Sequence, residues 1–557
     1  MPGQAVMARR LQAWYTTDMS ANPATTESQA DLQRRIERLN AIGAALSAES
    51  TPQALLELIL LGAKDLTRAD GGTVYRVEPD GSLAFVLVRN DSLGFAMGGS
   101  GGSPVTLPPI PLHLPDGAVN DASVVAHCVL AGTTVNIADA YHVQGFDFNG
   151  TRAFDFKTGY RSVSFLTVPM RDHEGVITGV IQLINARDVG GLVVPFGPED
   201  QRLVESLASQ AATAVSKHHL IEGQKALFEA FIKLIATAID EKSPYTGGHC
   251  RRVPELTMRL ADAAVAWQRG ALAGFAMTPA DRYELHIASW LHDCGKITTP
   301  EWVMDKATKL SRIYDRIDLI ATRFALAKAQ ARAACLESIL AGTDRTTATA
   351  AFTEVDARLD DDLVFLRRIN TGGEAMRAED QTRVRAIATR TVLAEDGSTR
   401  PLLTEDEVRN LCIARGTLLP EERDIINQHI TATIRMLESL PYPRHLRRVP
   451  EFAGGHHERM DGKGYPRGLT RDRMSIQARI MGIADVFEAL TAGDRPYKQA
   501  MKLSQALTIL GRMKIEGHID PDLFEAFIHS GLWREYAEKY LPESQRDEVD
   551  LHSIPGV

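Results

Sequence analysis

Short strand-like segments occur as two pairs in the first third of the chain. Segments 73–77 and 83–88 flank the turn sequence Pro-Asp-Gly at 79–81, which predicts an antiparallel hairpin. Segments 165–170 and 176–184, joined by a short polar turn, predict a second hairpin. The stretch between the two hairpins is rich in Gly and Pro, and we expect it to be irregular.

Further along, the spacing of apolar residues changes to the alternating steps of four and three that are typical of a helix. Between residues 200 and 240 this spacing includes Leu203, Leu207, Ala211, Ala214, Leu227, Phe231, Leu234 and Ala238. One interpretation is a helix that packs on its own domain. The other is a parallel dimer helix that carries a signal between domains. A shorter helix is predicted for residues 31–47.

A chain of 557 residues exceeds what one hydrophobic core usually supports, so we expect at least two domains. The net charge of −9 argues against broad attachment to nucleic acid or to anionic membranes. The five cysteines show no CxxC spacing, and no apolar run reaches the roughly 18 residues that span a bilayer. These features predict a cytoplasmic protein that binds neither DNA nor a membrane.

The order of elements up to residue 218 resembles a GAF domain. It consists of a helix, antiparallel strands, a variable segment, the sequence RSVSFLTVPMRDHEGVITGVIQLINARD and a closing helix after FGPED. The resemblance implies a small-molecule sensor built on an antiparallel sheet with helices. Some GAF domains bind cyclic nucleotides through a signature of Asn, Lys, Phe, Asp and Glu, which residues 149–155 match poorly. The ligand is therefore left unknown, and an unliganded or dimerising GAF domain is an equal alternative.

Most of the 16 histidines lie in polar surroundings that suggest no special role, but several in the second half of the chain differ. His292 and Asp293 end an apolar segment, ASWLHDCGKI, where an imidazole and a carboxylate can reach one centre. Such ligands suit Fe, Mn, Zn or Ni rather than calcium. Alone, this dipeptide is a weak signal.

The segment HHERMDGKGYP, from His456 to Pro466, places two imidazoles beside an acid and a Gly-bounded turn. A solvated surface turn is the alternative interpretation. Together with HDCGK, DEKSPYTGGHCRRV, LPEERDIINQH and RIMGIADVFEALTAGDRPYK, the segment resembles the HD-GYP family of HD-superfamily phosphohydrolases. These motifs occur in family order over about residues 228–540.

The resemblance implies an all-α domain that hydrolyses cyclic di-GMP to pGpG, and in some members onward to GMP. It implies that Asp293 bridges two metal ions within the ligand set His249, His292, Asp293, His429, His456, His457 and Asp485. Lys296 of the HDxGK motif is expected beside Asp293 as a catalytic residue. Substrate contacts are implied for Lys296, Tyr465, Arg495 and Lys498, although surface charges on a helix end are the alternative for the last two.

Two departures from the family pattern affect these expectations. Some members have a Glu four residues before the first histidine that supports a third metal, and this chain has Tyr245 there, a phenol that is neutral at pH 7. We therefore expect two divalent ions, Fe or Mn by resemblance with Zn, Ni and Mg as alternatives, and a slow second cleavage. The second departure is an insertion, residues 310–417, whose helical patterns at 312–340 and 353–370 predict a helical hairpin. It could be a lid, a dimer contact or an inert decoration.

The sequence thus predicts a multidomain α+β protein. Its parts are a flexible leader (1–28), a GAF-like sensor domain (29–200), a connecting helix (201–227), an HD-GYP domain (228–545) and a tail (546–557). Expected partners are a cyclic dinucleotide substrate, a second copy through the GAF domain and connecting helix, and a diguanylate cyclase at the GYP loop. Alternatives are a cyclic GMP-AMP substrate, another HD-superfamily nucleotide hydrolase, or an idle domain that acts by binding partners.

Overall fold

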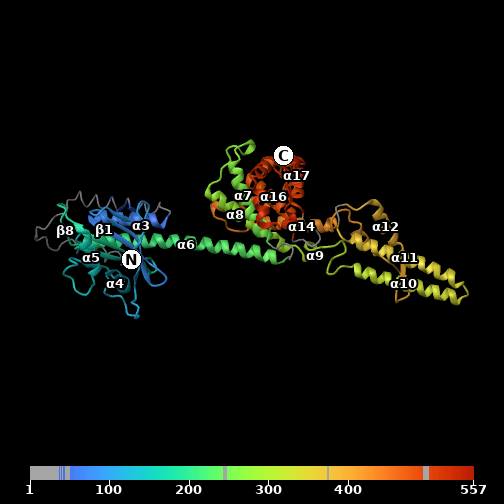
Figure 1. Ribbon diagram of the computed structural model, residues 1–557, viewed down its shortest axis with the longest axis horizontal. Coiled ribbons are helices and arrows are strands. Elements are labelled where there is room, and N and C mark those ends of the chain that lie inside the picture. Colours follow the sequence, from blue (N-terminus) through green and yellow to red (C-terminus); the bar gives the residue numbers. More distant parts are fainter. Residues whose placement is uncertain are drawn as a thin grey trace, which may run out of the picture. The chain divides into compact units, whose positions relative to one another are not determined.

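The computed structural model describes residues 51–242, 248–372, 375–493 and 501–557, together with 37, 39, 40, 42 and 43 (Figure 1). Those five single residues are helical and fall within the helix predicted at 31–47, whereas the predicted leader lies outside the described residues. The chain divides into two compact units, Met1–Ala226 and Leu227–Val557. Within the described ranges, no helix is both long and apolar enough to cross a membrane.

The first unit is built on one antiparallel sheet with the strand order β3-β2-β1-β7-β6-β5. Both predicted hairpins are confirmed, because β1 pairs with β2 and β6 pairs with β7. The strands of this sheet are β1 (Ala69–Val77), β2 (Ser82–Asn90), β3 (Phe95–Met97), β4 (Ile110–Pro111), β5 (Val135–Ile137), β6 (Phe165–Arg171), β7 (Ile177–Arg187) and β8 (Val193–Val194).

Successive residues of the central strands face opposite sides of this sheet, so each side has its own apolar cluster. Val74 packs in the cluster formed with helix α3 (Pro52–Thr67) and the first part of helix α6 (Pro198–Lys242). Its neighbour Tyr75 packs in a second cluster, together with residues of helix α4 (Val124–Ala131). This arrangement of an antiparallel sheet with helices is the fold that the sequence predicted.

The segment between the hairpins is more regular than predicted. It contains helix α4 and helix α5 (Asn149–Thr158). The first is a run of eight mostly apolar residues whose length and composition do not distinguish a helix from a strand. The second covers the stretch compared with the cyclic-nucleotide signature, and its buried Asp155 accepts hydrogen bonds from the Tyr141 hydroxyl and from Ser162. The Asp155 carboxylate therefore closes a loop of the domain itself.

Helix α6 is one continuous helix of 45 residues that extends beyond the predicted 201–227 at both ends. It begins at Pro198 with acidic residues in its first turn, which favour a helix start. In its first part Leu207 and Ala211 are buried against the sheet, so this part packs on its own domain. The apolar spacing continues to Ala238, and the chain remains helical to Lys242.

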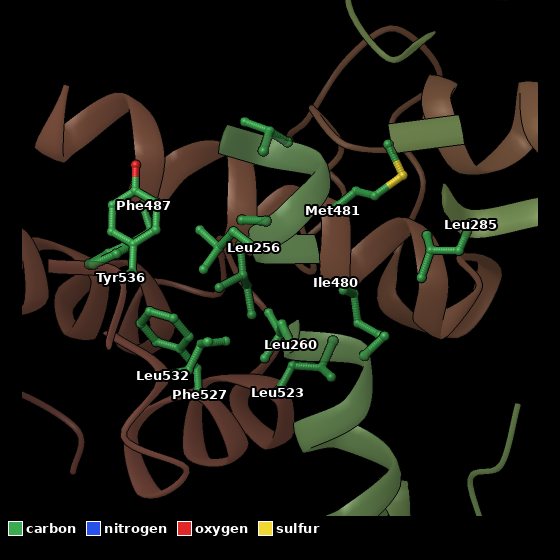
Figure 2. Close-up of a cluster of buried hydrophobic side chains, with 14 of the residues drawn as sticks. Leu256, Leu260, Leu285, Ile480, Met481, Phe487, Leu523, Phe527, Leu532 and Tyr536 are labelled. Atoms are coloured by element: carbon green, nitrogen blue, oxygen red, sulfur yellow. The ribbon is translucent and has the colours of Figure 1, made fainter. Parts of the chain in front are cut away.

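The second unit is largely helical, as expected, and its core lies among helices that are distant in sequence (Figure 2). Leu256, Ile480, Phe487, Leu523 and Phe527 are fully or nearly fully buried there. The helices around this core are α7 (His249–Ala266), α8 (Pro279–Leu291), α14 (Pro420–Glu438), α15 (Val449–Gly454), α16 (Ile476–Thr491), α17 (Leu503–Ile515), α18 (Pro521–His529) and α19 (Leu532–Tyr540).

The predicted helical hairpin of the insertion is present as α10 (Ile317–Leu340) and α11 (Arg345–Asn370), which pack along each other (Figure 1). The insertion also contains parts that the sequence did not predict: α12 (Ala378–Ala388), a small hairpin of β9 (Thr391–Leu393) and β10 (Thr399–Pro401), and α13 (Glu405–Leu411). It has its own apolar core, in which Leu310, Phe324 and Leu366 are buried and which shares no residue with the core of Figure 2.

The two ends of the insertion meet at its base. The Thr417 hydroxyl donates a hydrogen bond to the backbone oxygen of Lys306 at 2.9 Å. The buried Lys306 ammonium contacts Glu422 and Asn410 at 2.8 Å each. The Lys309 ammonium donates to the backbone oxygens of Leu411 and Ile413. Removal of the segment between these ends would therefore leave a gap that a short linker can close.

We predict that replacing residues 307–416 with a short Gly/Ser linker leaves the remaining helical unit folded. Lys306 and Thr417 stay in place, and Lys306 keeps its ion pair with Glu422. Circular dichroism should then show one cooperative thermal transition for the helical unit, with a loss of helical signal equal to that of the insertion. A non-cooperative or absent transition would show that the insertion builds part of the main core.

Candidate metal centre

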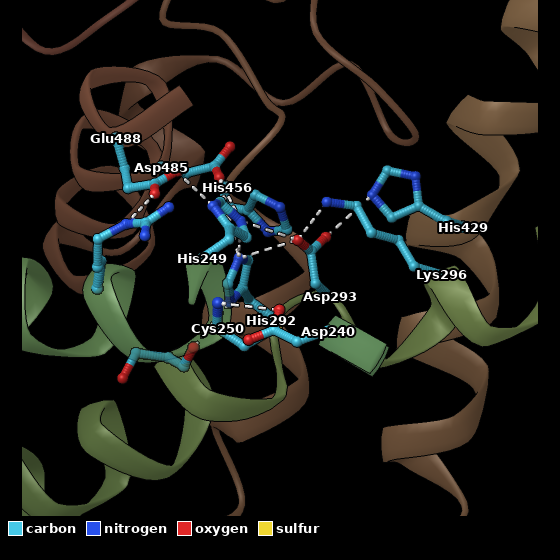
Figure 3. Close-up of polar contacts among 12 residues, drawn as sticks. Asp240, His249, Cys250, His292, Asp293, Lys296, His429, His456, Asp485 and Glu488 are labelled. Atoms are coloured by element: carbon cyan, nitrogen blue, oxygen red, sulfur yellow. Dashed lines mark hydrogen bonds and ion pairs between the residues drawn. The ribbon is translucent and has the colours of Figure 1, made fainter. Parts of the chain in front are cut away.

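The histidines and aspartates singled out in the sequence converge in the second unit from five separate segments (Figure 3). His249 opens α7, His292 and Asp293 follow α8, His429 lies on α14, His456 and His457 follow α15, and Asp485 lies on α16. Three residues with expected roles, Tyr245, Arg495 and Lys498, lie outside the described residues.

Helix α8 explains how two neighbouring side chains reach one centre. Its start is fixed by a capping box between Thr278 and Asp281. At its other end His292 still has helical dihedral angles (φ −55°, ψ −33°), whereas Asp293 has left the helix (φ −107°, ψ 11°). Both side chains are buried. The expectation that imidazole and carboxylate meet where the helix ends is confirmed.

The Asp293 carboxylate lies between two groups of histidines. Its Oδ2 atom is 3.1 Å from Nε2 of His249 and 3.3 Å from Nε2 of His292. Its Oδ1 atom is 3.3 Å from Nε2 of His429. Ligand atoms of His429, His456 and His457 lie within 4.8 Å of one another, as do those of His249, His292 and Asp293. Each carboxylate oxygen therefore faces a different potential cation position.

Asp485 completes one of these groups. Its Oδ1 atom lies 3.3 Å from Nε2 of His249 and 3.9 Å from Nε2 of His292. Asp485 lies on the buried face of α16. The group of His249, His292 and Asp485 thus combines two imidazoles with a carboxylate, which is a ligand set suited to transition metals.

Three of the histidines have the same second contact, which orients their rings. Nδ1 of His292, His429 and His456 lies 2.5–2.7 Å from the backbone oxygen of the residue three positions earlier. A backbone oxygen only accepts, so Nδ1 carries a proton, and in the neutral ring Nε2 presents a lone pair toward the centre. This is the arrangement that metal-binding histidines adopt.

Several of the inward-facing atoms have no hydrogen-bond partner within the described part of the chain. They are buried and include Oδ1 of Asp293, Nε2 of His429 and Nε2 of His456. The first two are 3.3 Å apart, yet both are acceptors when Nδ1 of His429 holds the ring proton. A buried polar atom without a partner costs about 1–3 kcal/mol. A cation between such acceptors removes this cost, so the residues present fit a metal centre.

The charges of the cluster support the same conclusion. Burial, together with the neighbouring His292, lowers the pKa of His456 to about 4, and burial also lowers the pKa of His457. Both imidazoles are therefore neutral near pH 7 and able to bind a metal. Burial opposes ionisation of Asp293, but Lys296 and His292 together hold its pKa well below the usual range. The centre thus offers two neutral imidazoles, those of His456 and His457, and an ionised carboxylate.

Lys296 and Gly295 lie on the short helix η2 (Cys294–Thr298), which packs closely on α14. The Lys296 ammonium is 2.5 Å from Oδ2 of Asp293, beside the centre as expected. A Cβ atom at Gly295 would lie 2.0 Å from the backbone oxygen of His429 and 2.6 Å from the backbone nitrogen of Thr433. Only glycine therefore allows the approach that brings His429 to Asp293.

The GYP loop packs on His457. The Tyr465 ring stacks on the His457 ring with centroids 4.8 Å apart and planes at 18°. A Cβ atom at Gly464 would lie 2.4 Å from the backbone nitrogen of Arg459, which explains the glycine. The buried Glu458 carboxylate closes the loop by accepting hydrogen bonds from the backbone of Arg467 and Leu469. The loop therefore fixes the orientation of the His457 ring.

Sequence reasoning missed Glu488, which lies one turn after Asp485 on α16. Its side chain is fully buried, and its Oε2 atom lies 2.5 Å from Nδ1 of His249. Its Oε1 atom lies 2.6 Å from Nε of Arg252. The spacing of the two acids at three residues was a signal available in the sequence. The partner, His249, is 239 residues away and could not be assigned without the fold.

Comparisons with known proteins identify two domain types in the chain. The family model of the GAF domain matches residues 51–215, and that of the HD domain matches residues 404–523. The protein therefore carries an N-terminal GAF domain followed by an HD domain. The HD match includes His429, His456, His457 and Asp485. The HD family implies divalent metal binding, in agreement with the geometry of the cluster.

Curated relatives match short parts of the chain. A 3′3′-cGAMP-specific phosphodiesterase of Vibrio cholerae is 40% identical over 96 residues, 17% of this chain and 22% of that protein. Cyclic di-GMP phosphodiesterases of Thermotoga maritima and Pseudomonas aeruginosa are 36% identical over 132 residues and 35% identical over 113 residues. These matches cover 24% and 20% of this chain, and 34% and 26% of those proteins. The chain thus spans only about a fifth to a third of the length of these relatives.

We predict that Gly295→Ala destabilises the helical unit by about 1–3 kcal/mol, the usual cost of forcing extra volume into a packed interior. The added methyl group must push α14, and His429 with it, away from Asp293. Urea unfolding measures the change. Gly223→Ala on α6, where the added Cβ meets no atom within 4 Å, is the control and should be neutral or slightly stabilising. Equal stability of both variants would contradict the close packing of η2 on α14.

Proposed function

We propose that the helical unit is a metal-dependent phosphodiesterase that hydrolyses cyclic di-GMP to linear pGpG. The observation that carries this proposal is the buried Asp293 carboxylate, whose two oxygens face separate groups of histidines. The HD domain and the activities in the names of the relatives support it. Those names describe the relatives. That this chain acts on the same class of substrate is part of the proposal.

In this proposal the two groups bind one cation each. His429, His456 and His457 would hold one ion, and His249, His292 and Asp485 would hold the other, with Asp293 available to both. The partnerless Nε2 atoms of His429 and His456 support the first position. The ionised Asp485 supports the second, because His249 and neighbouring histidines keep its pKa well below the usual range although burial opposes ionisation.

Hydrolysis breaks one of the two phosphodiester bonds of the ring. Water adds its oxygen to phosphorus, the bond from phosphorus to the ribose 3′ oxygen breaks, and that oxygen leaves with a proton. Two bound divalent ions would supply a nucleophilic water near neutral pH and stabilise charge on the attacked phosphate. Lys296, beside Asp293, adds a positive charge that orients the bridging carboxylate and can contact the phosphate. The stacking of Tyr465 on His457 supports a role for Tyr465 in contacting the substrate.

We propose two ions per chain, Fe or Mn in preference to Zn, Ni or Mg. The preference follows the resemblance, since imidazole and carboxylate ligands alone admit all of the transition metals named. The number follows from Tyr245, because a neutral phenol is a poor substitute for the carboxylate that supports a third ion. A slow second cleavage, with pGpG accumulating before GMP, would follow from the same substitution. Phosphate contacts by Arg495 and Lys498 remain predictions from the sequence.

One specific observation favours a second substrate. A relative at 40% identity carries the name of a 3′3′-cGAMP-specific phosphodiesterase. Metals and phosphates do not distinguish the bases, so cyclic GMP-AMP is the alternative substrate. Regulation by the GAF domain, a cytoplasmic location and contact with a diguanylate cyclase at the GYP loop are further parts of the proposal that rest on the sequence.

We also propose that α6 pairs with the same helix of a second copy. Ile232, Ala236 and Ile239 on one face of this helix are buried in the core of the helical unit. Successive residues turn by about 100°, so the residues 227, 231 and 234 lie on another face. Leu227, Phe231 and Leu234 are 59%, 55% and 62% exposed, at the steps of four and three that a parallel pair of helices requires.

We predict that Asp293→Ala abolishes hydrolysis of cyclic di-GMP and lowers the metal content below that of the parent protein. The reason is that one carboxylate serves both ions. Product chromatography after incubation with cyclic di-GMP, and in parallel with cyclic GMP-AMP, measures the activity, and elemental analysis measures the metals. His445→Ala, an exposed histidine of the same unit, is the control and should leave both unchanged.

Retention of activity and of two metals by Asp293→Ala would overturn the assignment of the centre. A parent protein that binds two metals but cleaves neither dinucleotide would leave the metal centre in place. It would favour the alternative interpretation, in which the domain is catalytically idle and acts by binding partners. Faster cleavage of cyclic GMP-AMP would transfer the proposal to the alternative substrate.

We predict that the double variant Leu227→Glu, Leu234→Glu is a monomer where the parent is a dimer. Four like charges would face one another across the paired helices, at positions where apolar contacts stabilise the pair. Light scattering after size-exclusion chromatography measures the mass. Glu222→Lys, on a face of α6 that points away from the exposed apolar residues, is the control and should remain dimeric. A monomeric parent would refute the pairing.

A further inference from the structure

His249 differs from the other histidines of the centre in the way its Nδ1 atom is held. His292, His429 and His456 each use a backbone oxygen three residues earlier, within their own helical segment. His249 is the first residue of α7, so this helix has no preceding turn that could supply such an oxygen. Among the described residues, the acceptor for Nδ1 of His249 comes from a different helix.

Glu488 provides that acceptor. Its Oε2 atom is 2.5 Å from Nδ1 of His249, and its side chain is completely buried. Its other oxygen is 2.6 Å from Nε of Arg252, which lies one turn after His249 on α7. Glu488 is therefore an acceptor that Arg252 holds in a fixed position.

The same helix holds both nitrogens of the His249 ring. Glu488 contacts Nδ1, and Asp485, one turn earlier on α16, lies 3.3 Å from Nε2. Residues three apart share a helix face, so the two carboxylates approach the ring from a single rigid element. With Nδ1 committed to Glu488, only Nε2 can face the centre. His429, His456 and His457 have no contact of this kind with Glu488 among the interactions of the described residues.

We propose that Glu488, held by Arg252, is a positioning residue that orients His249 and thereby sets the affinity of one cation, the one bound by His249, His292 and Asp485. The inference rests on the proposed metal centre and adds a residue that the resemblance does not assign. Glu488 replaces the backbone oxygen that the other histidines use. A carboxylate on the second nitrogen also makes the imidazole a stronger ligand.

The effect should be confined to one of the two ions. Loss of Glu488 leaves Nδ1 of His249 buried without an acceptor and frees the ring to rotate. Loss of such a partner typically weakens metal binding about 10- to 100-fold. The ion held by His429, His456 and His457 keeps all of its ligands and their backbone contacts. The affinity of that ion should therefore remain within a few-fold of its parent value.

The test is equilibrium dialysis of the metal-free full-length protein against Mn²⁺, with bound metal counted by elemental analysis. The parent should bind two ions. Glu488→Ala should bind one ion with parental affinity and the other about 10- to 100-fold more weakly. Glu488→Gln keeps an oxygen that can accept from Nδ1, so it should restore much of the lost affinity. Circular dichroism of each variant reports whether it is folded.

Glu284 offers a matched control. It is also a buried carboxylate of the helical unit paired with an arginine, since it accepts hydrogen bonds from the backbone and from Nε of Arg448. Glu284→Ala removes a buried ion pair of the same kind away from the centre. It should lower the thermal stability without changing either Mn²⁺ affinity. Selective weakening of one ion in Glu284→Ala would attribute the effect to general destabilisation and overturn the inference.

The remaining outcomes separate the inference from the proposed function. Two ions bound by Glu488→Ala with parental affinity, or equal weakening of both ions, would overturn the role of Glu488 and leave the metal centre standing. A parent that binds no Mn²⁺ would overturn both. If Glu488→Ala does not fold, Glu488→Met decides, because it keeps most of the side-chain volume but offers Nδ1 of His249 no oxygen, and parental affinity for both ions in this variant would refute the positioning role.

Discussion

The helical unit is organised around one unfavourable arrangement, in which Asp293 lies close to several imidazole nitrogens inside the protein. Acceptor atoms that face one another without a shared proton repel, and burial strengthens the repulsion because water cannot screen it. The surrounding apolar core must therefore hold these groups in place. Fully buried side chains such as Phe487 and Ile480 lie on the same helix as Asp485 and fix that helix against α7. Stability in the core thus maintains a centre that is unstable on its own.

Local signals in the sequence were sufficient for much of the fold. Both hairpins of the sheet follow from their turn residues, and the hairpin of the insertion follows from helical spacing. The short helix α4 was not predicted, because a run such as VVAHCVLA is equally apolar on all sides and its conformation is decided by the sheet against which it packs. The hairpin β9-β10 was missed for a related reason, since strands of three residues carry too little pattern.

The candidate site shows the same division. The clustering of His249, His292 and Asp293 was expected from motifs, and the structure brings these residues together with His429, His456, His457 and Asp485. Motifs name residues that touch the reacting centre, but they do not name the atoms that hold those residues. The contact of Glu488 with His249 joins two helices far apart in sequence, and the Gly295 approach to α14 depends on the packing of two backbones. Such features exist only after the chain has folded.

Helix α14 contacts both the base of the insertion and the candidate metal centre. Glu422 in its first turn holds Lys306 at the base of the insertion, and His429, seven residues later, reaches the centre. Seven residues are two helical turns, about 10 Å along a helix that bends very little. The insertion is therefore attached to the same helix that carries His429, a candidate metal ligand. A force on the insertion, from any source, would therefore displace His429 without any contact at the entrance of the site.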